Sequence, residues 1–354
     1  MGAPLATILA HYPALARPTA PPTALGNAGG ASGARLWRFP SGLGPLVLRA
    51  WPPDGPNRDE LAAIHAQQRK ARGLGFVPVP IETGAGGTVV EWGGRRWDLA
   101  PWMPGAADAA RPPALARLRA GCAGLAALHE TWGSRPSEGP SPGLALRLEE
   151  IAALRNGGFD AIEAALDRAP ADPRRDHARR WLDLARLLAH DEWERLRRVA
   201  PRTVTRQPCL RDARPEHFLF VGDRLTGLID FGATGIDSVS GDLARLLGEW
   251  VGAEPHVRDV AIAAYAAIRP LDAEEVALIA AFERPTAFLI GAHWTRWHFL
   301  EGRTFDDSAA VLSGLKRGWE RLSGLVGPGG DKAGIATPRA GNENPASGRE
   351  RPRH

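Results

Sequence analysis

Asp212, His217 and Asp230 have the types and the spacing that phosphoryl transfer requires. His217 follows Asp212 by five positions, and Asp230 opens the tripeptide Asp-Phe-Gly later in the same stretch. Phosphoryl transfer needs a carboxylate that orients the attacking hydroxyl, and ligands for a divalent metal that neutralises charge on the phosphates. One short stretch of the chain could supply both kinds of group.

A β-hairpin is predicted between these polar residues. Phe218–Val221 and Leu225–Ile229 are apolar, and the intervening Gly222-Asp223 is typical of a tight turn. The end of the second strand of a hairpin lies beside the start of its first strand. The three polar side chains are therefore expected to share one rim.

This stretch resembles the catalytic segment of the aminoglycoside phosphotransferase and choline kinase group, a kinase-like family that includes homoserine kinase relatives. The motif of that group reads His-Gly-Asp, four residues, then Asn, whereas this chain has Leu210-Arg211-Asp212 and then His217. The resemblance implies an α+β, protein-kinase-like fold with a small antiparallel β-rich N-lobe and a larger helical C-lobe. It implies that Asp212 is the catalytic base, that His217 and Asp230 are metal ligands, and that the cofactors are ATP and Mg²⁺ or Mn²⁺.

Four regions are expected along the chain. They are an N-terminal helix with a Pro-rich linker (1–25), an N-lobe with the nucleotide loop and hinge (26–105), a helical C-lobe that contains the catalytic hairpin 208–232 (106–326), and a tail (327–354). The tail is rich in glycine, proline and charge and almost lacks apolar residues, so we expect it to be disordered.

The start of the predicted N-lobe contains candidate contacts to nucleotide phosphates. Its glycines would let backbone amides approach phosphate, and the candidates there are Gly29, Gly30, Ser32 and Gly33. Glycines between strands are also ordinary hairpin turns. Arg49 lies in the strand where the family has a phosphate-binding Lys, and it keeps the charge but loses the compact head group. An exposed strand arginine is the alternative interpretation.

Two further parts of the N-lobe are expected to support nucleotide binding. The helix predicted over Asn57–Arg72 should orient the strand arginine, as a helix acid does in the family. Glu60 is available for that ion pair, although the position expected relative to the following segment 76–80 is nearer His65. By the same resemblance, the backbone around Leu99 and Pro101 would form the hinge that pairs with adenine.

The acceptor site is expected near a late helix. Helices are predicted over Ala273–Phe282 and Pro285–Leu300, and the second has aromatic and imidazole side chains close together. Because late helices of the larger lobe wall the acceptor site in the family, the candidate substrate contacts are Trp294, Trp297 and His298. Packing of the helix against its lobe would explain the same residues.

Composition limits the choice of partners. The chain has 44 basic and 40 acidic residues, a balance that does not indicate nucleic-acid binding. No apolar stretch reaches the roughly 20 residues that a membrane-spanning helix needs. Two cysteines without metal-site spacing exclude a disulfide framework. We therefore expect a cytoplasmic protein, monomeric or weakly dimeric, that acts on a small molecule and contacts neither a membrane nor nucleic acid.

Three functions remain open from the sequence. The leading hypothesis is an ATP-dependent phosphotransferase (kinase) that acts on an alcohol group of a small molecule. The departures at the His-Gly, Asn and Lys positions leave a catalytically impaired, nucleotide-binding or scaffold protein as the alternative. Ten arginines against six acidic residues in 168–202 could also bind an acidic partner, although solvated helix faces explain such runs. No acidic cluster follows Ala114, which argues against a polycationic aminoglycoside as acceptor.

Overall fold

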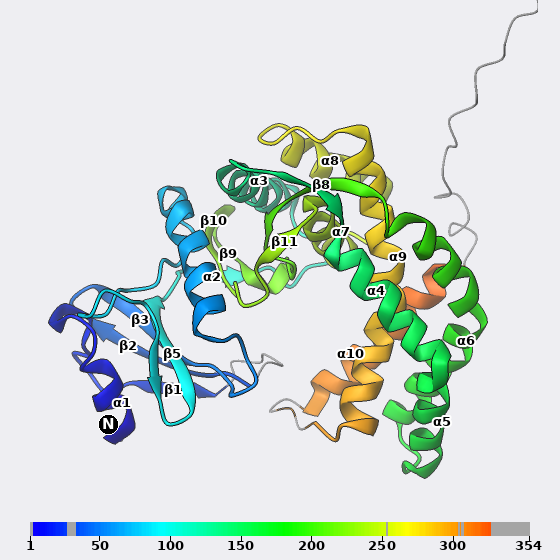
Figure 1. The fold of residues 1–354 in the computed structure, drawn as a ribbon, viewed down its shortest axis with the longest axis horizontal. Coiled ribbons are helices and arrows are strands. Elements are labelled where there is room, and N and C mark those ends of the chain that lie inside the picture. Colours follow the sequence, from blue (N-terminus) through cyan, green and yellow to red (C-terminus); the bar gives the residue numbers. More distant parts are fainter. Residues whose placement is uncertain (1–2, 27–32, 253, 304, 306–307, 327–354) are drawn as a thin grey trace, which may run out of the picture.

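The computed structural model describes residues 3–26, 33–252, 254–303, 305 and 308–326, so the predicted tail 327–354 lies outside the described residues. A β-rich N-terminal region stands beside a larger region made mostly of helices (Figure 1). This is the α+β arrangement of two unequal parts that the sequence predicts.

The N-terminal region is built on an antiparallel sheet of five strands. In spatial order they are β1 (Thr23–Gly26), β2 (Arg35–Ser41), β3 (Gly44–Ala50), β5 (Arg95–Pro101) and β4 (Val90–Trp92). Alternate residues of β3 are buried, namely Leu46, Leu48 and Ala50, because successive side chains of a strand point to opposite faces. Helix α1 (Ala3–Leu9) packs into the same core through Ile8.

Helix α2 (Arg58–Lys70) begins at a capping box. The Asn57 side chain accepts from the Glu60 amide, and Glu60 Oε2 accepts from the Asn57 amide at 2.7 Å. The Glu60 carboxylate is thereby committed to the start of the helix. The buried side of α2 includes His65 and Gln68.

In the part of the chain that the structure describes, eight α-helices form most of the second region. They are α3 (Leu115–Trp132), α4 (Pro142–Ala153), α5 (Phe159–Arg168), α6 (Pro173–Val199), α7 (Val239–Trp250), α8 (Pro255–Ala266), α9 (Ala273–Thr295) and α10 (Ser308–Gly324). Their apolar faces form one continuous core in which Trp132, Trp181 and Trp250 are the largest buried side chains. Among the helices described, none is long and apolar enough to cross a membrane.

Two small sheets lie among these helices. One has the strands β10 (Arg224–Leu228), β9 (Phe218–Val221) and β6 (Ala106–Ala107), and the other has β11 (Gly235–Asp237), β8 (Thr203–Cys209) and β7 (Ser137–Pro140). Strands β9 and β10 form the predicted antiparallel hairpin, although β10 begins and ends one residue before the predicted second strand. The amide of Leu228 also donates to the carbonyl of Phe76, so the hairpin is bonded to the segment after α2.

Helix α9 corrects the sequence prediction of two separate helices. A proline inside a helix removes a hydrogen bond, which is why the sequence predicts a break before Pro285. The structure has one helix through Pro285, followed by a π-helical turn at Arg296–Leu300. Phe282 and Phe288 on either side are almost fully buried, so tertiary packing outweighs the local cost of the proline.

The close contact between α9 and α10 should be sensitive to volume. A Cβ atom on Gly318 of α10 would lie 2.6 Å from the Cα atom of Gly291 in α9. Gly318→Val should therefore push the helices apart and lower the free energy of unfolding by about 1–3 kcal/mol. Urea denaturation would measure this loss. Gly324→Ala in the same helix meets no atom within 4 Å and should leave stability unchanged or slightly higher.

Candidate active site

The structure brings Asp212, His217 and Asp230 to one rim, as the hairpin predicts. The Nδ1 atom of His217 lies 2.9 Å from the carbonyl oxygen of Asp212, and Nε2 lies 3.7 Å from Asp230 Oδ2. A carbonyl can only accept, so Nδ1 is the donor of this bond. In neutral imidazole, Nε2 then presents a lone pair towards the Asp230 carboxylate. A nitrogen lone pair and a carboxylate oxygen that face each other are a donor set that fits a divalent cation.

The backbone at this rim is held in an uncommon conformation. Arg211 has a φ of 64° and Asp230 a φ of 61°, and within the described part of the chain no other non-glycine residue has a positive φ. Such conformations persist only where surrounding contacts enforce them, and they concentrate at functional sites. One of the two residues, Arg211, directly precedes Asp212, and the other, Asp230, is itself the candidate metal ligand.

The Asp212 carboxylate faces helix α7. Its Oδ1 atom lies 3.3 Å from Nε of Arg245, and Arg245 also pairs with Glu249 at 3.1 Å. About a third of the Asp212 side chain remains exposed, so one side of the carboxylate is open to an acceptor. Sequence reasoning missed Arg245. The signal available was its spacing of four residues from Glu249 in a helix that directly follows the hairpin.

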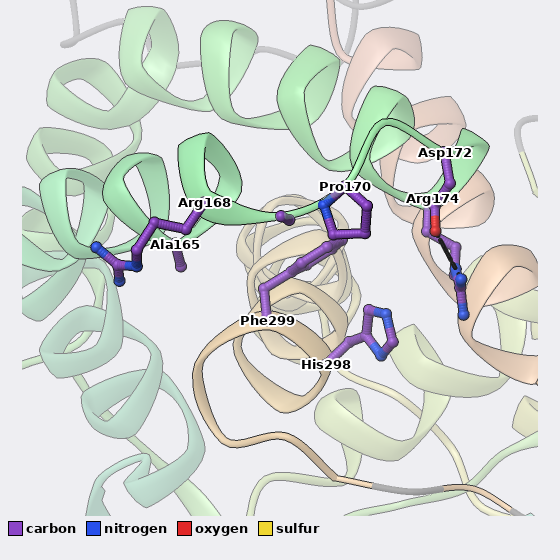
Figure 2. Close-up of a pocket in the computed structure, with 8 residues that line it drawn as sticks. Ala165, Arg168, Pro170, Asp172, Arg174, His298 and Phe299 are labelled. Carbon is purple, nitrogen blue, oxygen red and sulfur yellow. Dashed lines mark hydrogen bonds and ion pairs between the residues drawn. The ribbon is translucent and has the colours of Figure 1, made fainter.

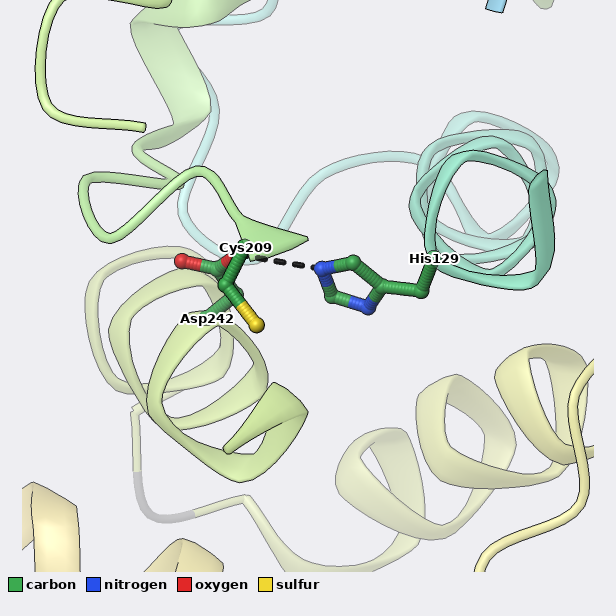
Figure 3. Close-up of side chains that lie close together, drawn as sticks. All are labelled: His129, Cys209 and Asp242. Atoms are coloured by element: carbon green, nitrogen blue, oxygen red, sulfur yellow. Dashed lines mark hydrogen bonds and ion pairs between the residues drawn. The ribbon is translucent and has the colours of Figure 1, made fainter. Parts of the chain in front are cut away.

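A buried carboxylate supports the turn before Asp212. Asp242 Oδ2 accepts from the amide of Leu210 at 2.7 Å and lies 3.0 Å from Nε2 of His129 (Figure 3). The hydroxyl of Tyr265 lies 2.7 Å from the other nitrogen of that imidazole. A tyrosine O–H that donates to Nδ1, with an Nε2–H that donates to Asp242 Oδ2, gives both imidazole nitrogens a partner. The backbone leading into Asp212 is thus fixed from α3, α7 and α8 together.

Cys209 joins His129 and Asp242 in a cluster whose ligand-type atoms lie within 4.8 Å of one another (Figure 3). Metal binding would require a thiolate. Burial, with the nearby Asp242 and Asp237 carboxylates, raises the pKa of Cys209 well above its ordinary value. The thiol instead lies 3.3 Å from the carbonyl oxygen of Asp237. We therefore interpret this cluster as structural support and not as a metal site.

Arg49 lies opposite Asp98 in the pairing of β3 with β5. Its guanidinium carbon is 4.7 Å from the centre of the Trp51 ring, and Trp51 Nε1 donates to Asp98 Oδ2 at 2.5 Å. His65 of α2 places Nε2 3.5 Å from the same oxygen. The acid beside the strand arginine therefore comes from β5. The expectation of Glu60 is wrong because that carboxylate caps α2, whereas the expectation of contact near His65 is met through Asp98.

Trp51 also joins this network to the hairpin. A Cβ atom on Gly232, the last residue of Asp-Phe-Gly, would lie 3.1 Å from the edge of the Trp51 ring. Phe231 packs edge-on against Trp132 with ring centres 6.0 Å apart. The N-terminal sheet and the candidate metal ligand Asp230 are therefore linked through direct packing.

The structure limits the other predicted nucleotide contacts. Gly29, Gly30 and Ser32 lie outside the described residues. Gly33 is described and lies beside Pro52. Leu99 is fully buried, and its carbonyl accepts from the amide of Ile81 at 2.7 Å. Pro101, at the end of β5, is partly exposed.

The predicted acceptor residues fall into two places. Trp294 and Trp297 pack edge-on with ring centres 5.3 Å apart, and both lie near Phe305. His298 instead lines a cavity of about 350 Å³ beside the connection between α5 and α6, together with Phe299 (Figure 2). Trp294 lies at the end of α9, whereas Trp297 and His298 are neighbours in the π-helical turn and their side chains leave it in different directions.

Comparison with known proteins identifies relatives of this arrangement. The model of the phosphotransferase enzyme family matches residues 23–279. A homoserine kinase of Methylobacterium nodulans is 33% identical over 213 residues, which are 58% of this chain and 59% of that protein. A homoserine kinase of Methylobacterium sp. strain 4-46 matches similarly, with 33% identity over 211 residues. The chain thus spans less than two thirds of the length of these curated relatives.

Solved structures support the fold independently. An aminoglycoside phosphotransferase from Alicyclobacillus acidocaldarius aligns with a TM-score of 0.58 and 16% identity, covering 90% of this chain and 92% of the other. An amicoumacin kinase in complex with AMP-PNP, Ca²⁺ and its antibiotic aligns with a TM-score of 0.61 and 14% identity over the same shares. At such low identity these likenesses establish the fold, and they confirm the predicted kinase-like, two-lobe architecture.

The ionised Asp98 carboxylate should make the free energy of unfolding depend on pH under acidic conditions. Burial opposes ionisation of Asp98, but Arg49, His65 and the Trp51 indole outweigh it and lower its pKa. A lowered pKa in the folded state stabilises the protein above the unfolded value near 4, and that contribution disappears as pH falls through the folded pKa. The free energy of unfolding of the native chain should exceed that of Asp98→Asn at pH 7.

The excess should shrink below about pH 4, and urea titrations between pH 3 and 7 would measure it. Asp54→Asn, an exposed acid nearby, is the matched control and should show no such trend. A difference between the native chain and Asp98→Asn that stays constant with pH would contradict the ionised network around Asp98.

Proposed function

Because the chain belongs to the phosphotransferase enzyme family, we propose that it transfers the γ-phosphoryl group of ATP to a hydroxyl of a small-molecule acceptor. The observation that carries this proposal is the shared rim of Asp212, His217 and Asp230. It combines a partly exposed carboxylate with an imidazole lone pair and a second carboxylate that face each other across 3.7 Å. Phosphoryl transfer relies mainly on positioning and charge stabilisation, which these groups are suited to supply.

His217 and Asp230 are proposed to hold a divalent cation. The bond from Nδ1 to the Asp212 carbonyl fixes the ring so that Nε2 is the ligand atom, as outer hydrogen bonds do for metal-bound histidines generally. A bound cation would neutralise charge on the phosphate oxygens. Imidazole suits Mn²⁺ better than the hard Mg²⁺ ion, so we propose Mn²⁺ as the preferred metal. The amicoumacin kinase complex, with its ATP analogue and Ca²⁺, supports the use of nucleotide and divalent metal in this fold.

Asp212 is proposed to accept the proton of the acceptor hydroxyl. Arg245 forms an ion pair with one carboxylate oxygen at 3.3 Å, which leaves the other oxygen for the acceptor. The strained backbone at Arg211, supported through Leu210 by Asp242, sets the position of the whole side chain. General-base contributions of this kind amount to a factor of about 10²–10⁴ in rate.

Arg49 is proposed to bind the nucleotide phosphates from β3. Its stacking on Trp51 and its place beside Asp98 keep the guanidinium in a defined position. Gly33 would border the phosphates. The hinge proposal keeps Pro101, at the partly exposed end of β5, and gives up Leu99, whose carbonyl already bonds to Ile81.

Homoserine is the first acceptor to test. Homoserine is the substrate named for the relatives with 33% identity. Because the match covers only 59% of that protein, homoserine is a proposal for the present chain. Trp294 and Trp297 remain proposed as part of the acceptor wall. His298 is removed from that proposal because it lines the separate cavity beside α5 and α6.

The alternative of an impaired scaffold finds no support in the contacts. Two departures from the family motif retain charged partners: Nε2 of His217 lies 3.7 Å from Asp230, and Arg49 lies opposite Asp98. A surface for an acidic partner on 168–202 is also less favoured, because several of its arginines pair with acids, including Arg179 and Arg186 with Glu163.

Asp212→Asn should lower turnover by a factor of about 10² or more, because the amide cannot take the hydroxyl proton. Coupled measurement of ADP formation with homoserine would give the rate, and calorimetry should show unchanged ATP binding. Asp223→Asn in the turn of the same hairpin is the control and should keep full activity, since Asp223 is exposed. Full activity of Asp212→Asn would remove Asp212 from the mechanism.

His217→Asn should change the metal preference. The native enzyme should turn over faster with Mn²⁺ than with Mg²⁺, and an amide oxygen at position 217 should raise the Mg²⁺ rate relative to the Mn²⁺ rate. Steady-state rates at saturating concentrations of each metal provide the ratio. The same Mn²⁺ to Mg²⁺ ratio in both proteins would mean that His217 is not a ligand.

A further inference from the structure

Arg147 of α4 is a cation without an acidic partner in direct contact. Nη1 donates to the carbonyl of Gly143 at 2.8 Å, and Nε donates to Oγ1 of Thr286 in α9 at 3.1 Å. Across the described ranges, no carboxylate oxygen lies within 4.0 Å of its guanidinium. Burial, with the positive charge of Arg245 next in importance, lowers the pKa of Arg147 to about 10. A guanidinium held in this way would be stabilised by an anion that is not part of the fold.

This guanidinium belongs to the surroundings of the catalytic rim. The charged groups that act on it include Arg245, Asp237 and Arg211. Arg245 contacts the Asp212 carboxylate at 3.3 Å, and Arg211 lies 3.7 Å from Asp237. A Cβ atom on Gly143 would meet both Asp237 Oδ2 and Nη1 of Arg147, so this guanidinium lies near the carboxylate that pairs with Arg211. Arg147 therefore lies among the charged groups that border the Arg211-Asp212 turn, on the helix that follows β7. The residue as a whole is partly exposed.

Glu150 offers the opposite charge one turn later on α4. Residues three apart lie on the same side of a helix, with Cβ atoms about 5–6 Å apart. Glu150 Oε1 lies 3.1 Å from Nε2 of His293, whose ring stacks on Trp297. Burial opposes ionisation of Glu150, but His293, Arg147 and Arg296 outweigh it and lower its pKa. A cation and an anion at this spacing match a molecule that carries both charges on one carbon.

We propose that Arg147 and Glu150 form the head-group subsite of the acceptor, in which Arg147 binds the carboxylate and Glu150 the ammonium of a hydroxy-α-amino acid. This inference rests on the proposed phosphotransfer at Asp212. The side-chain hydroxyl of the amino acid would extend from α4 towards Asp212. Polycationic acceptors are disfavoured by Arg147 and Arg245, and an amino alcohol without a carboxylate would leave Arg147 unpaired.

Three acceptors test the two charged contacts one at a time. L-Homoserine carries both charged groups, 3-amino-1-propanol lacks the carboxylate, and 4-hydroxybutyrate lacks the ammonium. Arg147→Gln should raise the KM for homoserine by about 10- to 100-fold, the size expected for a lost charge-assisted hydrogen bond. It should leave the KM for 3-amino-1-propanol and the KM for ATP unchanged. Glu150→Gln should raise the KM for homoserine and spare 4-hydroxybutyrate.

Matched controls exclude general damage to the fold. Glu149→Gln, on an exposed side of the same helix, and Arg155→Gln, just beyond it, should leave all three acceptors unaffected. Arg147→Lys keeps the charge and should recover part of the homoserine affinity. Equal KM increases for homoserine and 3-amino-1-propanol in Arg147→Gln would overturn the subsite.

Calorimetric titration with homoserine separates the subsite from the proposed reaction. Homoserine binding that Arg147→Gln weakens would support the subsite even if no acceptor were phosphorylated, an outcome that would refute only the phosphotransfer. Turnover of homoserine that Arg147→Gln and Glu150→Gln leave unchanged would refute only the subsite. Absence of homoserine binding to the native chain would also refute it.

Discussion

Asp242 Oδ2 accepts a hydrogen bond from the amide of Leu210 at 2.7 Å inside the buried core, and the rim of Asp212, His217 and Asp230 depends on this bond. A buried carboxylate is costly without partners, and the same oxygen also pairs with His129, which is itself bonded to Tyr265. The turn that follows can then adopt the left-handed conformation at Arg211 that projects Asp212 from the loop. Helix α7 contacts the turn on both sides of Arg211. Asp242 binds the amide of Leu210, and Arg245, three residues later, pairs with the Asp212 carboxylate.

The N-terminal sheet also contains a buried carboxylate that neighbouring side chains stabilise. Asp98 is buried, and it is stabilised as an anion by Arg49, His65 and the Trp51 indole. These contacts fix the arginine proposed for the nucleotide phosphates, and Trp51 then packs against Gly232 beside the candidate metal ligand. The proposed phosphate contact Arg49 and the candidate metal ligand Asp230 are therefore linked through one indole ring. A change in the position of α2, which contributes His65, would act on both.

The sequence predicts the local parts of this account well. The alternation of apolar residues and the Gly222-Asp223 turn predict the hairpin, and the hairpin alone brings Asp230 back to His217. The kinase-like fold is what the resemblance of this segment implies, and family membership and structural comparison confirm it. The hairpin and its rim depend on residues within about 20 positions of one another, where chain geometry leaves few alternatives.

The contacts that the sequence did not predict join residues far apart in the chain. Asp242 and His129 are separated by 113 positions, and nothing in either residue type names the other as its partner. Glu60 was considered as an available partner for Arg49, although Asn57 three residues earlier is a capping-box signal that explains Glu60 locally. Arg147 and Glu150 are positioned by Thr286 and His293 of α9, which lie 139 and 143 residues later in the chain. Local propensity also did not predict that α9 continues through Pro285.

Phosphorus-31 NMR tests the central claim most directly, because it observes the transferred phosphoryl group itself. The native protein is incubated with ATP, Mn²⁺ and L-homoserine, and spectra are recorded after a chelating resin has removed the paramagnetic Mn²⁺. The account predicts a new phosphomonoester resonance, coupled to the methylene protons of the acceptor, that grows as the γ-phosphate resonance of ATP declines. Unchanged ATP, or release of inorganic phosphate alone, with homoserine, amino alcohols and hydroxy acids in turn would contradict it.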